Sequence, residues 1–260
     1  MGTDNREKSR INFLNGGAGR NAVLAATAAA PAAFADELAL GLGAVGETPV
    51  YRGDSGHVYP FPMVSYENES FYLRGLQGGY YLWNDAQNKL SLTAYYNPFG
   101  FKPGDSDDNQ MKQLERRRGT LMAGLSYRYD AQWGTLRTML AGDTLDYSNG
   151  LVWDSAYLYR FNDGDWSLTP GVGITWSSEN QNRYYYGVTG DESARSGLRN
   201  YQPNDSWSPY VELNAGYQIN SSWRSWVGGR YVRLSDEVKN SPMVDKNYNL
   251  MLGGGVSYTF

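Results

Sequence analysis

The sequence contains no cysteine and only one histidine. The absence of cysteine excludes a disulfide framework and any thiol chemistry. A single histidine, His57, cannot supply the ligands of a zinc site, and no matching serine and carboxylate complete a hydrolytic triad around it, so we interpret it as a solvated loop residue. We therefore predict no catalytic residue, no metal site and no cofactor, and we expect that the protein is not an enzyme.

The chain also lacks the apolar run of about twenty residues that a transmembrane helix needs. Its mean hydropathy of -0.58 is too polar for a helical membrane protein. Its net charge of -4 at pH 7 gives no electrostatic basis for binding nucleic acid. Transmembrane helices and nucleic-acid partners are both excluded.

Tyrosine, tryptophan and glycine are abundant instead. The 260 residues include 22 Tyr, 8 Trp and 31 Gly. Outer-membrane β-barrels place aromatic side chains at both membrane interfaces, which favours an all-β protein that crosses the membrane with strands. A soluble β-sandwich or a lipocalin-like barrel is the alternative that the strand pattern must exclude.

The last thirteen residues alternate between large apolar and small or polar side chains. A tilted strand of about ten residues crosses the hydrocarbon core of a bilayer, so this pattern predicts a final transmembrane strand. We expect the barrel assembly machinery to recognise this C-terminal strand. We also expect three of its aromatic residues to lie in the girdles at the membrane interfaces: Tyr248, Tyr258 and Phe260.

Residues 166–176 repeat the pattern, with Trp166 and Trp176 at the two ends of the apolar face. Ten tilted residues separate the two rings by about 25 Å along the membrane normal, which is the height of the apolar band of an outer-membrane barrel. We predict that each tryptophan belongs to one interface girdle.

Charged residues of both signs occupy inward positions of the predicted strands: Arg128, Asp154, Arg160 and Glu212. Arg137 and Asp143 lie on a less regular strand. Burying such charges in the core of a sandwich would be costly, whereas a wet or ion-paired barrel lumen accepts them. These charges are the strongest argument against a soluble fold.

The connections between the predicted strands are of two kinds. Short ones, such as 131–132, 162–164 and 220–222, have tight-turn composition and are expected in the periplasm. Long polar ones, 100–119, 179–205 and 235–247, are expected outside the cell, facing lipopolysaccharide. Three consecutive tyrosines in the second long loop are predicted to form an outer-loop surface, either as a platform for a glycan or solute or as packing over the barrel mouth: Tyr184, Tyr185 and Tyr186.

The strand count depends on two segments. We find eleven candidate strands, and single-chain bacterial barrels have an even number. Glycines in 70–82 could bend that segment into two strands, which predicts a single antiparallel transmembrane barrel of twelve. Ten is the alternative, if an N-terminal segment such as the one with Pro60 and Pro62 runs along the rim. Residues 1–35 are predicted to be a signal peptide or an N-terminal extension, and 36–260 the barrel.

Six segments, in order, resemble the MipA/OmpV family: GGYYLWND (78–85), LAGDTLDYSNG (140–150), SENQNRYYYGV (178–188), ESARSGLRNY (192–201), NDSWSPY (204–210) and LSDEVKNSPMVD (234–245). The resemblance implies a Gram-negative outer-membrane scaffold of murein (peptidoglycan) metabolism. Its partners would be a lytic murein transglycosylase and a bifunctional penicillin-binding protein. The family offers no catalytic residues to compare. A small-solute channel and an adhesin are the alternative functions.

Overall fold

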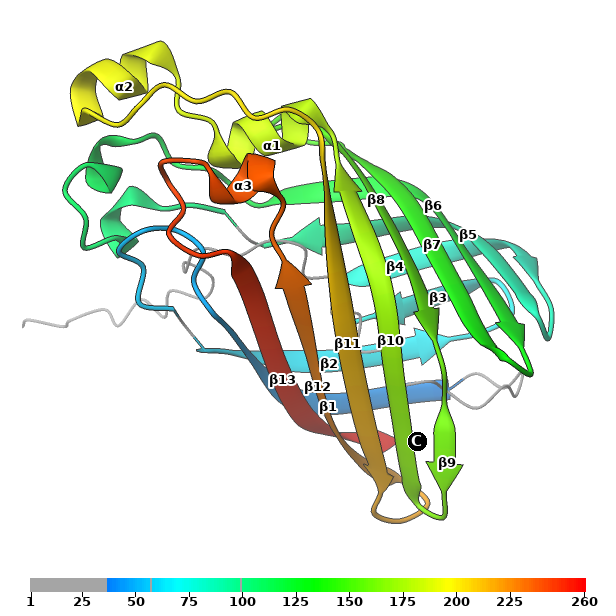
Figure 1. The fold of residues 1–260 in the computed structure, drawn as a ribbon. Coiled ribbons are helices and arrows are strands. Elements are labelled where there is room, and N and C mark those ends of the chain that lie inside the picture. Colours follow the sequence, from blue (N-terminus) through cyan, green and yellow to red (C-terminus); the bar gives the residue numbers. More distant parts are fainter. Residues whose placement is uncertain (1–36, 57, 99) are drawn as a thin grey trace, which may run out of the picture.

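Antiparallel strands form the closed wall of a barrel (Figure 1). The computed structural model describes residues 37–56, 58–98 and 100–260, so the predicted signal peptide and His57 lie outside the described residues. In chain order the strands are β1 (Glu37–Glu47), β2 (Val58–Glu67), β3 (Phe71–Arg74), β4 (Gln77–Asn84), β5 (Asn88–Asn97), β6 (Thr120–Ala131), β7 (Gly134–Asp143), β8 (Leu151–Leu158), β9 (Phe161–Asp163), β10 (Trp166–Ser177), β11 (Ser206–Gln218), β12 (Trp223–Arg233) and β13 (Tyr248–Thr259).

The prediction of twelve strands is confirmed, because β8 and β9 form one strand of the wall. Both pair with β10, which also pairs with β11, and β1 pairs with β13 to close the barrel. The interruption between them lies opposite Pro170. The Tyr159 N–H donates to the Pro170 carbonyl at 3.0 Å, but proline has no N–H to return the bond.

Side chains alternate between the lumen and the outer face, as the sequence patterns predict. On β13, Met251 is fully buried while the next residue, Leu252, is 55% exposed. On β6, Met122 is buried and Leu121 and Leu125 are exposed. Exposed leucines in such numbers suit a surface that faces lipid instead of water.

Segment 70–82 divides as the sequence predicts. Strands β3 and β4 pair with each other and are joined by Gly75 and Leu76. Gly75 has a φ of 57°, in the left-handed region that glycine tolerates best. The tight turn therefore falls at the first of the glycines that the sequence offers.

The ten-strand alternative is wrong, because Pro60 and Pro62 lie within β2, a full strand of the wall paired with β1. The wall tolerates both prolines for a geometric reason. The short β3 pairs with β2 only along Ser65–Glu67, and above that the Gly75 N–H donates to the Val64 carbonyl. Backbone polar groups two residues apart point to the same side, so both prolines lack an N–H on an edge where no described strand pairs.

The two ends of the barrel differ in their connections. At one end, called the turn end, the five turns are 68–70, 85–87, 132–133, 164–165 and 219–222. The other end carries long loops, which fold into α1 (Glu179–Tyr186), α2 (Gly190–Ser196), α3 (Asp236–Lys239) and two short 3-10 helices, η1 (Pro103–Asp105) and η2 (Met111–Gln113). No helix in the described ranges is long and apolar enough to cross a membrane.

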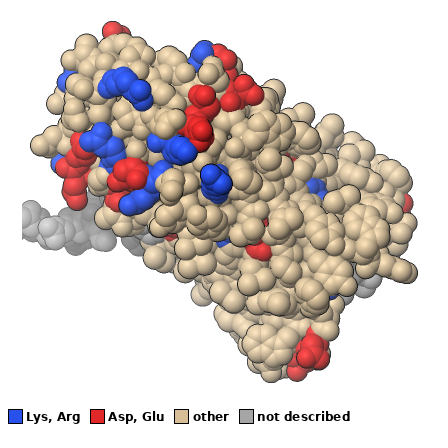
Figure 2. Space-filling view, viewed as in Figure 1, with Lys and Arg blue, Asp and Glu red and all other residues tan. Residues whose placement is uncertain are grey.

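Charged side chains gather over the helical end in the view of Figure 2. The flank of the barrel in the same view shows only a few scattered charged side chains, and acidic side chains gather again at its tip. This distribution fits a wall embedded in lipid between two polar ends.

Candidate functional site

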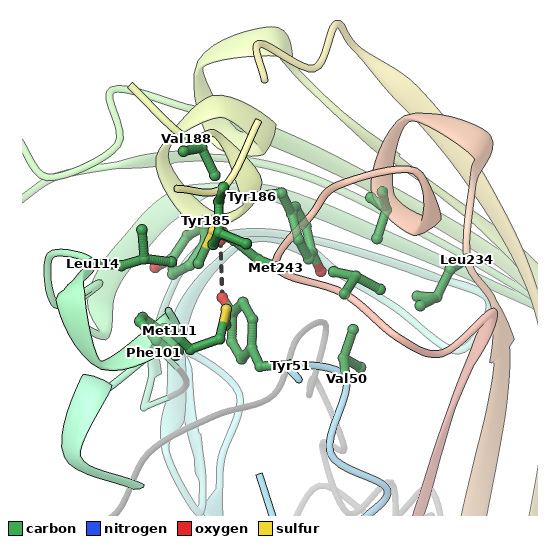
Figure 3. Close-up of a cluster of buried hydrophobic side chains, with 13 residues drawn as sticks. Val50, Tyr51, Phe101, Met111, Leu114, Tyr185, Tyr186, Val188, Leu234 and Met243 are labelled. Carbon is green, nitrogen blue, oxygen red and sulfur yellow. Dashed lines mark hydrogen bonds between the residues drawn. The ribbon is translucent and has the colours of Figure 1, made fainter. Parts of the chain in front are cut away.

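The loops at the helical end of the barrel enclose a cluster of buried hydrophobic side chains (Figure 3). Four loops supply its thirteen buried residues: Val50, Tyr51, Phe101, Met111, Leu114, Tyr185, Tyr186, Val188, Leu198, Leu234, Val238, Met243 and Val244. We call these four loops together, 48–56, 100–119, 178–205 and 234–247, the cap. A loop assembly with a buried hydrophobic core of this size is a folded layer and not a set of solvated connections.

A buried ion pair joins two loops of the cap. Arg117 Nη2 lies 2.8 Å from Glu192 Oε1 and 3.0 Å from Oε2, with the two side chains only 7% and 1% exposed. The same carboxylate accepts the backbone N–H groups of Glu115 and Thr189, and Arg117 also donates to the Gly187 carbonyl. Every oxygen of this carboxylate is therefore satisfied, as burial requires.

Several causes shift the pKa of Glu192. Burial by itself would raise it, but the N–H groups of Glu115 and Thr189 and the Arg117 guanidinium stabilise the ionised form more, and the pKa is lowered from its ordinary 4.5. The carboxylate is thus ionised at neutral pH, and the pair with Arg117 is at full strength there.

The three tyrosines predicted as an outer-loop surface differ in how deeply they are buried. Tyr185 and Tyr186 are each 3% exposed, so the expectation of a surface is wrong for both. The Tyr51 hydroxyl donates to the Tyr185 carbonyl at 3.0 Å, the bond drawn in Figure 3. Tyr184 is partly buried against the same cluster, and its hydroxyl accepts the Arg118 N–H. Packing over the barrel end is the interpretation that the burial supports.

A charged network crosses the middle of the lumen between β7 and β12. Arg230 Nη2 lies 2.6 Å from Glu212 Oε2, and Arg137 Nη2 lies 3.3 Å from the same oxygen. Asp154 is the second carboxylate, 3.7 Å from Arg137 and 3.9 Å from Arg230. It accepts hydrogen bonds from the hydroxyls of Tyr210 and Thr175 at 2.9 and 2.8 Å. We call these six residues the lumen network; two cations face two anions within it.

Glycines on β10 make room for this network. The inward positions of β10 between the two carboxylates are Gly171 and Gly173. A Cβ at Gly171 would lie 3.0 Å from Glu212, and one at Gly173 would overlap the ring of Tyr210. Long side chains from β11 can therefore lie across β10 and reach β8.

The structure places the four predicted lumen charges in two groups. Asp154 and Glu212 belong to the lumen network and are 7% and 6% exposed. Arg128 lies nearer the turn end, paired with Asp130 at 2.7 Å, and Arg160 follows the end of β8. That any part of the lumen is wet stays a prediction.

The predicted girdle residues form aromatic pairs at both ends of the wall. At the turn end, Trp166 lies 4.7 Å from Tyr217 and Tyr258 lies 4.9 Å from Phe260, between ring centres. At the cap end, Tyr248 stacks on Tyr231 at 5.5 Å. Trp176, also at the cap end, donates to the Asp205 carboxylate at 3.0 Å. That these rings mark the two membrane interfaces stays a prediction.

Sequence reasoning missed Arg230, Arg117 and Glu192. Arg230 was detectable, because it shares the inward parity of β12 with Gly228 while Val227 and Tyr231 face outward. Glu192 carried a local signal as well. Thr189 and Glu192 form a reciprocal capping box at the start of α2. A threonine followed three residues later by a glutamate is a sequence pattern that predicts the start of a helix. Nothing local in the sequence pairs Arg117 with Glu192.

The loop between β7 and β8 is organised by one carboxylate. Asp143 accepts backbone N–H groups from four residues of this loop, at 2.6 to 3.1 Å: Leu145, Tyr147, Ser148 and Asn149. Ser148 in turn donates to Gln181 Oε1 on α1 at 2.9 Å. The loop thereby fastens the wall to the cap.

Replacing Asp143 with asparagine should loosen this loop, since the charge that binds four N–H groups is lost. We expect a cost of about 1–3 kcal/mol in the free energy of unfolding, with faster amide exchange confined to 144–150. Asp146→Asn is the matched control, because Asp146 is exposed in the same loop. Equal amide protection in the two variants would contradict the assignment.

Comparison with known proteins gives consistent matches along nearly the whole chain. The family model described as MltA-interacting protein MipA matches residues 40–260. The MltA-interacting proteins of Escherichia coli (strain K12) and Shigella flexneri are each 55% identical over 239 residues, which cover 92% of this chain and 96% of theirs. Outer membrane protein OmpV of Vibrio cholerae is 26% identical over 221 residues, 84% of this chain and 85% of its own.

Proposed function

Because the chain belongs to the MltA-interacting protein (MipA) family and is an outer-membrane β-barrel, we propose that it is a scaffold of murein metabolism that binds a lytic murein transglycosylase. The support for this partner is the name of relatives that share 55% of their residues with this chain. We further propose, from the family resemblance, that a bifunctional penicillin-binding protein joins the same complex.

The observation that carries the proposal is the filling of the barrel. A small-solute channel needs a continuous wet path, but here buried side chains of both signs meet in the middle of the lumen and the cap packs over one end. Two arginines that are fully matched by carboxylates leave no unbalanced charge there to attract a passing ion. A barrel closed in this way favours a role in binding proteins over a role in transport.

The proposed binding surface is the turn end, which we place in the periplasm. Its turns are short, and stable protein interfaces bury on the order of 1,200–2,000 Å² in total. Such a surface is small for two partners. We therefore propose that binding is weak for each partner alone and gains strength because partners anchored in the same membrane meet at a high effective concentration.

Single introduced cysteines test this proposal, since the chain has none of its own. We choose the exposed turn positions Ala86→Cys, Gln132→Cys and Ser221→Cys, with Asp191→Cys on the cap as the control. Barrels carrying a photo-crosslinker at these sites would be inserted in liposomes in both orientations, so that a purified lytic murein transglycosylase added outside can reach either end of the barrel. We expect crosslinks from the turn positions and none from the cap. Crosslinks from the cap alone, or from no position, would refute the proposal.

A further inference from the structure

An arginine lies over an exposed tyrosine ring at the edge where the wall meets the cap. The Arg118 guanidinium is 5.6 Å from the centre of the Tyr147 ring, and Arg118 Nη1 is 3.5 Å from the Tyr147 hydroxyl. Both side chains are exposed. Arg118 lies two residues before β6, and Tyr147 lies in the loop between β7 and β8. A cation within about 6 Å of a ring centre is attracted to the face of the ring, which keeps the two side chains together.

The backbone of Arg118 is held in place by two tyrosines of α1. Its N–H donates to the Tyr184 hydroxyl at 2.7 Å, and its carbonyl accepts a hydrogen bond from the Tyr185 hydroxyl at 3.0 Å. The rings of these two tyrosines meet edge to face at 4.8 Å, and Tyr185 belongs to the buried core of the cap. Arg118 is thus anchored through its main chain while its side chain stays exposed.

The loop that carries the ring, 144–150, is fixed as well. Thr144 ties it to the start of β6, since its N–H and its hydroxyl donate to the Leu121 carbonyl at 2.9 and 2.8 Å. Asp146 and Asn149 have φ values of 59° and 50°, in the left-handed region that aspartate and asparagine tolerate better than most other residues. The arginine and the ring are therefore held from two separate segments, and both are in place before a ligand arrives.

The charge of Arg118 is not paired with a carboxylate of the described residues. The acidic residues of the adjoining cap loops, Glu115 and Glu192, pair with other arginines. The side chains that act on the charge of Arg118 are Tyr147 and Tyr184, and the aspartates of the neighbouring loop are not among them. A guanidinium has five N–H donors, and the Tyr147 hydroxyl accepts from one of them, so the others can bind an anion.

Lipid-facing leucines lie beside this pair. Leu121, the first outward residue of β6, is 37% exposed, and Leu145, two residues before Tyr147, is 45% exposed. Exposed apolar side chains on the wall face the acyl chains of the membrane, whereas exposed tyrosines and charges at the end of the wall lie at the level of the head groups. A lipid whose tail runs along these leucines would place its head group beside Arg118.

We propose that Arg118 and Tyr147, which we call the head-group site, bind the phosphorylated sugar of a glycolipid in the outer leaflet. A guanidinium matches a phosphate with two parallel hydrogen bonds. The exposed tyrosine ring offers a sugar both an apolar face and a hydroxyl. The lipid A part of lipopolysaccharide combines these groups with acyl chains, and the choice of this lipid rests on the cap lying outside the cell. A lipid bound in this way fastens the cap end of the barrel to the outer leaflet.

The test is native mass spectrometry of the purified full-length barrel, folded in detergent without lipopolysaccharide and then mixed with lipid A that carries its phosphates. We expect the unaltered barrel to retain lipid A and Arg118→Gln to bind it about tenfold more weakly, because a charged bidentate contact is lost. Arg118→Lys, which keeps the charge but not the planar guanidinium, should fall between the two. Unchanged heat-modifiable mobility in gels would show that all variants are folded.

Arg199→Gln is the matched control. Arg199 is also exposed and lies over the Tyr201 ring at 5.2 Å, but its guanidinium donates to the Asn240 carbonyl of another cap loop at 2.8 Å. This variant removes an arginine stacked on a tyrosine without touching the head-group site, so it should retain lipid A as the unaltered protein does.

Three results would overturn the proposal: no lipid A retained by the unaltered barrel, equal retention by Arg118→Gln, or equal retention of lipid A without its phosphates. Two further probes test the source of the phosphate. Equal retention of phosphatidylglycerol would show that the sugar is not recognised, and displacement of lipid A by inorganic phosphate at the same concentration would show a site for free anions. Either outcome also contradicts the proposal. No transglycosylase is present in this experiment, so its failure would leave the crosslinking test of the scaffold unaffected.

Discussion

Replacing Glu192 with glutamine is expected to release the cap while the barrel beneath it stays closed. The substitution leaves Arg117 buried at 7% exposure without its counter-charge. Removing one partner of a buried ion pair typically costs about 3–5 kcal/mol. Amide exchange in 178–205 and 100–119 should accelerate by on the order of a hundredfold or more, while exchange in the strands stays slow.

Asp191→Asn is the matched control for this experiment, because it makes the same chemical change at an exposed position of the same helix. We expect it to leave amide exchange in the cap nearly unchanged. If Glu192→Gln behaved like Asp191→Asn, the ion pair with Arg117 would not hold the two loops together.

The cap should also become less stable as the pH falls. The direction of this change follows from the lowered pKa of Glu192. A carboxyl group with a lower pKa in the folded state than its ordinary 4.5 stabilises the fold fully above that ordinary value. Its contribution is lost as the pH falls below 4.5 and through the lower folded pKa. We expect the cap of the unaltered protein to lose exchange protection in this range, and that of Glu192→Gln to show little further change.

The second large effect is expected at the centre of the lumen. Glu212→Ala would remove the carboxylate that lies nearest to Arg230, whose side chain is 3% exposed, and would leave Asp154 at the longer distance of 3.9 Å. A buried charge that loses its partner costs about 3–5 kcal/mol. The free energy of unfolding in urea, followed by tryptophan fluorescence and heat-modifiable mobility, should fall by this amount.

A double variant separates the charge effect from simple loss of volume. Glu212→Met/Arg230→Met removes both charges and keeps apolar bulk, so it should be much more stable than Glu212→Ala, since buried pairs replaced by apolar residues are often neutral in stability. Glu179→Gln, which breaks an exposed pair with Arg183, should cost no more than about 1 kcal/mol. A double variant as unstable as Glu212→Ala would show that packing and not charge pairing dominates this site.

The wall of the barrel was predictable because each strand separates two different environments. Lipid outside and a polar lumen inside impose a period of two that appears directly in segments such as 248–260 and 166–176. Gly75 even marked where one long segment becomes two strands. The prolines of β2 suggested only the ten-strand alternative, which is wrong because the wall tolerates them where the short β3 leaves the edge of β2 unpaired.

The cap was not predictable in the same way. Its core joins Tyr51 to Tyr185 and Met243, residues that lie far apart in the chain and follow no common period. Polar composition predicted only long loops outside the cell, although the capping box at Thr189 marked one of the helices. Such a layer is determined by contacts between loops that only the closed barrel brings together.

The pairing of β1 with β13 also determines when the barrel can close during folding. Ala39 lies opposite Thr259, so nearly the whole chain separates the two residues that complete the wall. This seam cannot form before the last strand has been synthesised and delivered. Until then the strands at both open edges expose unpaired N–H and C=O groups, and contacts between residues so distant in sequence form slowly. The interval before closure is thus when the protein is most at risk of pairing with the wrong neighbour.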